Sequence, residues 1–154
     1  MTCIAYKDGV IAYDSRITSG SEITYDDYEK CRLVKDVRFF LSGFTCDYEK
    51  LVGAWFGESP KGNVEASALV FDGEKLWRIA YHENDGLSKA PIPLDRPYVI
   101  GSGSPHAQTA MDMGASASRA VEMAKKRDTG TGGKVNTFAL PGWAPDTFAR
   151  VEEA

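Results

Sequence analysis

The dipeptides Asp8-Gly9 and Asp72-Gly73 most constrain the fold, because each lies between two runs of β-forming residues. The flanking runs are residues 2–7 and 10–15 for the first dipeptide, and residues 65–71 and 75–81 for the second. An Asp-Gly pair readily adopts the positive φ angles of a tight hairpin turn. The sequence therefore predicts antiparallel hairpins at the start and in the middle of the chain.

Further β-rich runs extend this pattern. They are residues 17–25, interrupted by Ser19-Gly20-Ser21, and residues 30–35, 38–41, 98–100 and 134–140. The pair 30–35 and 38–41 is predicted to be a hairpin that turns at Asp36-Val37, and the prolines at 91, 93 and 97 predict a loop. We expect the first third of the chain to form one sheet and residues 65–100 to contribute to a second.

Three helices are predicted between these runs. The first spans Tyr48 to Phe56 with Asp47 as its N-cap. The second begins with Ser104 as N-cap and ends before Gly114, and the third runs from Ser116 to about Arg127. This order of elements predicts one α+β domain over residues 1–154, with two antiparallel sheets face to face and helices outside.

Composition and charge argue against several classes of protein. A net charge of −4 and an isoelectric point near 5.2 argue against a nucleic-acid partner, because phosphate binding requires a basic face. No apolar run approaches the length of about 18 residues that a membrane-spanning helix needs. Charged residues interrupt the N-terminus too early for a signal peptide. We therefore expect a cytoplasmic protein without a membrane partner.

Cysteine and histidine spacing predicts neither disulfides nor a metal site. The three cysteines, Cys3, Cys31 and Cys46, are odd in number and have no CxxC spacing, and the two histidines lie in no zinc-binding pattern. We expect reduced thiols, no metal and no cofactor.

Thr2 becomes the first residue once Met1 is removed, which its small side chain permits. An N-terminal threonine carries a hydroxyl nucleophile and a free α-amine on one residue, so it can attack an acyl carbon without a histidine base. Many ordinary proteins also begin Met-Thr. Cys3 could serve as an N-terminal nucleophile if two residues were cleaved, although it is also a small strand residue.

Thr2 is followed by the predicted hairpin of residues 2–15, by Asp14 at the far end of that hairpin and by Lys30 further on. Taken in order along the chain, these features resemble the proteasome β-subunit and the bacterial HslV peptidase, N-terminal nucleophile hydrolases with a four-layer αββα fold. The resemblance covers nearly the whole chain and implies that Thr2, Asp14 and Lys30 hold the places of nucleophile, aspartate and lysine. An ammonium group near the amine would favour its neutral, basic form. Asp14 would hold Lys30 in place.

Three other segments match the family's motifs. The turn at residues 41–47 implies that the Gly43 N–H binds the oxyanion, and the Gly-Ser-Gly turn at residues 101–103 nominates Ser102. Residues 128–132 resemble the proteasomal Asp-x-x-Ser-Gly segment with Thr131 in place of serine, so that Asp128 and Thr131 would support the site.

Each of these residues also fits a structural role. Asp14 could be a solvated residue beside a turn, and Lys30 could be one more surface charge in an acidic run. The others could simply shape turns and loops: Gly43, Ser102, Asp128 and Thr131.

The resemblance also nominates substrate-binding residues and predicts one departure from the family. Ile17 and Thr18 would flank the substrate backbone. The first specificity pocket would be lined by Tyr28, Arg32, Leu41, Thr45 and Glu49. The loop that follows the helix after Asp47 leads directly to a strand, so the family's second long helix in this region is expected to be missing.

The sequence therefore predicts a threonine-type endopeptidase, a short divergent member of this family, acting on peptides or unfolded proteins. A homo-oligomeric ring and an ATP-dependent unfoldase as partner are implied by the resemblance alone. The alternatives are a catalytically inactive ring subunit, which would retain Met1, and an N-terminal nucleophile hydrolase of small amides.

Overall fold

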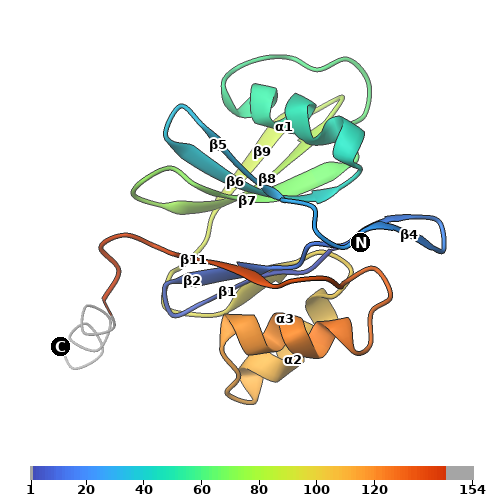
Figure 1. Cartoon of the computed structure of the whole chain (residues 1–154). Helices are drawn as coiled ribbons and strands as arrows, with labels where there is room; N and C mark the ends of the chain where they lie inside the picture. The colour runs from blue at the N-terminus through green and yellow to red at the C-terminus, as the bar shows by residue number, and fades with distance from the viewer. Residues whose placement is uncertain (1, 145–154) are drawn as a thin grey trace.

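Two antiparallel sheets pack face to face in the middle of the molecule (Figure 1). The computed structural model describes residues 2–144. The four-stranded sheet has the order β10-β1-β2-β11. Its strands are β1 (Ile4–Lys7), β2 (Val10–Tyr13), β10 (Tyr98–Ile100) and β11 (Asn136–Ala139). Asp8 and Gly9 have φ angles of 48° and 79°, which confirms the tight turn between β1 and β2.

The second sheet has five strands in the order β5-β6-β7-β8-β9, so each pairs with the next along the chain. Its strands are β5 (Cys31–Val34), β6 (Val37–Gly43), β7 (Ala66–Phe71), β8 (Leu76–His82) and β9 (Gly86–Pro91). A separate hairpin of β3 (Ile17–Ser19) and β4 (Glu22–Tyr25) projects from the end of the sandwich where the N-terminus lies (Figure 1).

Helices cover the outer face of each sheet (Figure 1). A 3₁₀ turn, η1 (Thr45–Asp47), leads into α1 (Tyr48–Trp55), which lies on the five-stranded sheet. The pair α2 (Ser104–Asp112) and α3 (Ala117–Lys125) lies on the four-stranded sheet. The predicted α+β fold with four αββα layers is confirmed. None of the helices in residues 2–144 has the length and hydropathy needed to span a bilayer.

Strand alternation sends neighbouring side chains into different cores. On β1, Ile4 and Tyr6 enter the core between the sheets, whereas Ala5 packs under α2 and α3. On β6, Phe40 enters the core between the sheets and Phe39 packs under α1. Both faces of these strands are buried, which explains their continuous apolar runs. Burial of each large apolar side chain contributes about 1.5–3 kcal/mol to stability.

The pairing of the strands corrects the predicted sheets. The first third of the chain does not form one sheet, because β1 and β2 pair with the later strands β10 and β11. Strand β6 instead pairs with β7, which joins the β5–β6 hairpin to the five-stranded sheet. Pairing between distant strands leaves no local signal in the sequence, since it depends on which apolar faces meet.

Strand β9 was not predicted. Its residues are half-buried or exposed and have low β propensity, as suits an edge strand that ends in a proline. The missed signal was Asp85-Gly86, because Gly86 has a φ of 76° and opens the strand opposite His82. The turn between β5 and β6 also differs by one residue, since Lys35 and Asp36 adopt the positive φ angles.

One predicted helix cap is wrong, because Ser104 lies inside α2 and Gly103 is the N-cap. Asp47 is the N-cap residue of α1, as predicted, but its side chain makes no capping bond and its carboxylate accepts the Glu65 N–H at 2.8 Å. Ser116 does cap α3, since its side chain accepts the Arg119 N–H. As expected, no helix follows α1 before β7 in the described chain.

Candidate active site

Thr2 lies two residues before the start of β1, where two loops hold its backbone. Its N–H donates to the Gly130 carbonyl at 3.1 Å, and the Gly103 N–H donates to the Thr2 carbonyl at 3.0 Å. A Cβ atom at Gly101 would lie 2.3 Å from the Thr2 carbonyl oxygen, so only glycine permits this close approach. The turn at residues 101–103 therefore holds Thr2 in place, and Thr2 is only 1% exposed.

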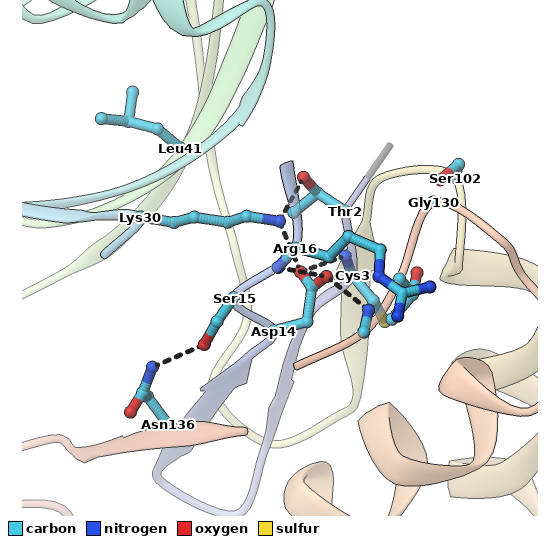
Figure 2. A network of polar contacts seen from close by, with 12 residues as sticks. Thr2, Cys3, Asp14, Ser15, Arg16, Lys30, Leu41, Ser102, Gly130 and Asn136 are labelled. Carbon is cyan, nitrogen blue, oxygen red and sulfur yellow. Dashed lines mark hydrogen bonds and ion pairs between the residues drawn. The ribbon is translucent and has the colours of Figure 1, made fainter. Parts of the chain in front are cut away.

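Thr2, Lys30 and Asp14 form one buried polar chain (Figure 2). The Lys30 ammonium lies 2.8 Å from Thr2 Oγ1 and 2.7 Å from Asp14 Oδ1. Asp14 directly follows β2 and Lys30 directly precedes β5, so the two sheets jointly bring the pair to Thr2. Both charged side chains are fully buried, which excludes the alternative interpretations as solvated residues.

Backbone donors complete the environment of the Asp14 carboxylate. Oδ1 accepts the Cys3 N–H at 3.1 Å, and Oδ2 accepts the Gly132 N–H at 3.0 Å and the Arg16 N–H at 3.3 Å. Both carboxylate oxygens are therefore hydrogen-bonded within the buried site. Burial lowers the pKa of Lys30 from its usual value, and the Asp14 charge opposes this effect.

Cys3 has the properties of a core residue. It is fully buried in the cluster between the four-stranded sheet and its two helices. Burial, followed by the nearby Asp14 charge, raises the pKa of the Cys3 thiol to about 12. The thiol is therefore protonated at neutral pH, which makes Cys3 a poor nucleophile.

A second polar network lies beside the Thr2 amide. Asp128 Oδ2 accepts hydrogen bonds from Ser102 Oγ and Thr131 Oγ1, each at 2.6 Å. Burial disfavours the Asp128 charge, but these two bonds and the Gly130 N–H outweigh burial and lower the pKa of the carboxyl. The three predicted residues are thus in contact, and they support the loop that accepts the Thr2 N–H.

A cavity of about 130 Å³ opens next to Thr2. Four of the predicted site residues line it together with Thr2: Ile17, Thr18, Gly43 and Thr45. Gly43 has a φ of 111°, and a Cβ there would lie 2.3 Å from the Glu65 carbonyl oxygen, so this position requires glycine.

The other predicted pocket residues lie outside the lining of this cavity. Leu41 is fully buried in the core under α1, and its side chain points away from Thr2 (Figure 2). Arg32 donates to the Tyr28 hydroxyl at 3.0 Å and forms an ion pair with Glu49 at 3.5 Å. The polar groups of Arg32, Tyr28 and Glu49 are thus bonded to one another. Leu41 is corrected to a core residue.

Three lining residues were missed: Arg16, Phe44 and Cys46. Arg16 binds Asp26 through two nitrogens at 2.8 and 3.2 Å and donates to the Thr129 carbonyl at 3.2 Å. A signal for Arg16 existed, because residues two apart in an extended segment point to the same side and Arg16 follows Asp14 by two. In residues 2–144, no cluster of three or more His, Cys, Asp or Glu side chains could hold a metal ion.

Comparisons with known proteins bear on the fold. No protein-family model matches the sequence, and no curated protein matches it. Among solved structures, Thiobacillus denitrificans BPH has a TM-score of 0.64 at 21% identity, covering 92% of this chain and 98% of its own. The chain has the proteasome-like N-terminal nucleophile hydrolase fold.

Two further structures agree with this assignment. BPH in complex with epoxomicin has a TM-score of 0.63 at 19% identity, covering 90% of this chain and 98% of its own. Eukaryotic HslV from Trypanosoma brucei has a TM-score of 0.64 at 19% identity, covering 89% of this chain and 97% of its own. At these identities the similarity establishes the shared fold.

Proposed function

We propose that this protein is a threonine peptidase that hydrolyses peptide bonds with Thr2 as nucleophile after removal of Met1. The observation that carries the proposal is the buried chain from Thr2 Oγ1 to Lys30 Nζ at 2.8 Å and on to Asp14 Oδ1 at 2.7 Å. Burying two charges is costly unless they are paired, and here the pair ends on a hydroxyl at the edge of a cavity. Such an arrangement suits an activated nucleophile.

In the proposed reaction, Thr2 Oγ1 attacks the substrate carbonyl carbon and its proton passes to the Thr2 α-amine. The Lys30 ammonium disfavours protonation of this amine and so keeps it neutral and able to accept the proton. A model α-amine has a pKa of about 7.7–8.0, so a modest lowering places the base near neutral pH. Lys30 also orients the hydroxyl by donating to Thr2 Oγ1, while Asp14 holds the ammonium.

The oxyanion that forms would be stabilised by the Gly43 N–H. Gly43 lines the cavity with Thr2, which supports this role, and an oxyanion donor typically lowers a barrier by about 3–4 kcal/mol. Ser102, Asp128 and Thr131 would orient the α-amine through the Gly130 carbonyl, which accepts the Thr2 N–H.

Removal of Met1 is the first step of the proposal. Thr2 has a φ of 118°, a conformation that costs a β-branched residue of order 1–3 kcal/mol. Cleavage of the Met1–Thr2 bond abolishes this torsion and releases the amine. The new amine can keep the hydrogen bond to the Gly130 carbonyl.

The wider proposal is a short divergent relative of the HslV and proteasome peptidases that acts in the cytoplasm. Ile17 and Thr18 would flank the substrate backbone, and Thr45 would contact the side chain on the acyl side. Tyr28, Arg32 and Glu49 would act at the rim of that pocket. A homo-oligomeric ring and an ATP-dependent unfoldase are further parts of the proposal, supported by the fold similarity.

A peptide epoxyketone tests the proposal, because closure of a six-membered morpholine-type ring requires a hydroxyl and a free α-amine on one residue. We expect the adduct on Thr2 alone. Labelling should disappear in Thr2→Ala and in a variant with one residue inserted between Met1 and Thr2. Thr2→Ser should retain some labelling. Cys46→Ser is the matched control, because Cys46 lines the same cavity without an α-amine.

The other candidate functions correspond to distinct outcomes. Full retention of Met1 without labelling would identify a catalytically inactive ring subunit. Turnover of small amides but not peptides would identify a small-amide hydrolase. Peptide mapping that located the label on Cys3 or Ser102 would mean that Thr2 is the wrong nucleophile.

A further inference from the structure

The hairpin of β3 and β4 exposes large apolar side chains to solvent. It forms a sheet of its own that projects from the sandwich beside the N-terminus (Figure 1). Every residue of β4 is exposed, and Ile23 and Tyr25 are each 53% exposed. Isolated two-stranded hairpins are marginally stable in water. An apolar residue on such a hairpin is therefore better suited to contact with a ligand than to packing.

A second cavity, of about 350 Å³, lies against this hairpin. One wall is the hairpin, where Thr18 and Ile23 are direct cross-strand partners and so present their side chains together. The opposite wall belongs to the loops beside Thr2 and comprises Ser102, Asp128, Thr129 and Gly130. Arg16 and Thr18 line both this cavity and the smaller one next to Thr2, so the two cavities adjoin.

The position of the Thr2 nitrogen determines which part of a substrate each cavity would take. In the proposed reaction, Thr2 Oγ1 bonds to the carbonyl carbon and the carbon–nitrogen bond breaks. The proton that the α-amine took from Oγ1 passes to the departing nitrogen, so this nitrogen must lie on the side of the amine. The Thr2 nitrogen is 3.1 Å from the Gly130 carbonyl, and Gly130 lines only the larger cavity.

We propose that the larger cavity binds the substrate segment that follows the scissile bond, with an apolar side chain of that segment packed against Ile23. This inference rests on the proposed function and adds a binding site for the leaving peptide. The smaller cavity, which Gly43 lines, takes the acyl side.

The chemistry of the larger cavity selects for length and apolar contact. The Arg16 guanidinium is bound to Asp26 and to the Thr129 carbonyl, and the Asp128 carboxylate accepts two hydroxyls. These charged groups are already engaged within the protein, which leaves Ile23 as the large apolar contact of the lining. A small amide leaving group is too short to use it.

Two substrates with the same acyl side test the inference. One ends in an aminocoumarin amide, and the other continues for three residues with leucine first after the scissile bond. We expect the ratio of kcat/KM for the long substrate over the short one to fall about 10-fold in Ile23→Ala, since loss of methylenes from an apolar contact has effects of this order. Tyr25→Ala is the matched control, because Tyr25 has the same exposure on the same strand but packs beside Tyr28 and does not line the cavity.

The outcomes separate this inference from the proposed function. An unchanged ratio in Ile23→Ala, with epoxyketone labelling of Thr2 intact, overturns the leaving-side site and leaves the peptidase standing. An equal fall for both substrates, or an equal change of the ratio in Tyr25→Ala, assigns the hairpin a structural role and also overturns it. Absence of labelling in the wild-type protein overturns both proposals.

Discussion

Replacing Lys30 with methionine removes a buried charge while it nearly preserves side-chain volume. At 2.7 Å, the attraction between Lys30 and Asp14 is about 6 kcal/mol at an effective dielectric of about 20, before desolvation is subtracted. Removing one partner of a buried pair typically costs about 3–5 kcal/mol. Because the Asp14 carboxylate keeps three backbone N–H donors, we expect the lower end, about 3 kcal/mol.

This estimate predicts a measurable loss of stability. For a chain of 154 residues, each kcal/mol shifts Tm by about 2–4 °C, so Lys30→Met should lower Tm by about 6–12 °C. The Lys30 side chain is among the largest that are fully buried, so its replacement affects stability as well as catalysis. Chemical denaturation followed by fluorescence measures the loss of unfolding free energy, and thermal denaturation measures the change in Tm.

Lys30→Met should also lower the catalytic rate, for a reason separate from the loss of stability. Without the ammonium, the Thr2 amine regains its ordinary basicity and Oγ1 loses its donor, so kcat/KM should fall at least about 100-fold. The double variant Asp14→Asn with Lys30→Met leaves no buried charge at this pair. It should recover part of the stability lost in Lys30→Met and remain inactive.

These expectations can be refuted together. If Lys30→Met unfolds at the wild-type denaturant concentration and keeps turnover within threefold of wild type, the buried ion pair and the proposed activation of Thr2 are both wrong. A double variant that is less stable than Lys30→Met would show that the unpaired Asp14 charge is not the source of the loss.

Three further predictions follow from the geometry. Gly43→Ala should destabilise the protein by about 1–3 kcal/mol more than Gly73→Ala in denaturant titrations. Both glycines have φ above 100°, but only a Cβ at Gly43 would clash with backbone atoms. Equal losses of stability would argue against the clash. Asp128 has a lowered pKa in the folded state. Its contribution to the free energy of unfolding is therefore fully present above the usual carboxyl pKa near 4 and is lost as pH falls below it. Asp128→Asn should therefore flatten stability against pH in acid, and an unchanged profile would contradict this. Native mass spectrometry at micromolar concentration should report a homo-oligomer, and monomer alone would count against a ring.

Local chemistry in the sequence determined the turns and most helix boundaries. Asp8-Gly9 predicted its hairpin because the positive φ angles there depend on those two residues alone. Ser116 predicted the start of α3 because its hydroxyl reaches the amide three residues on. Elements that rest on contacts within about four residues can be inferred in this way.

The candidate nucleophile and its partners were also found from the sequence, through resemblance of motifs in order along the chain. That approach reached Thr2, Asp14 and Lys30, which the structure brings within hydrogen-bond distance. It failed for Leu41, because a residue on a strand buried on both faces can point to either core and the motif does not specify which.

Only the tertiary structure decided what depends on distant segments meeting. Asp47 is the N-cap residue of α1, but its carboxylate accepts the N–H of Glu65, where the chain returns, and makes no bond to a helix amide. The pairing of β1 with β10 places the turn at residues 101–103 over Thr2. The adjoining cavities exist because the loops after β2, after β10 and before β11 converge at one end of the sandwich. Local sequence preferences do not predict these contacts, since the free energy of the contacts comes from packing and hydrogen bonds between segments far apart in the sequence.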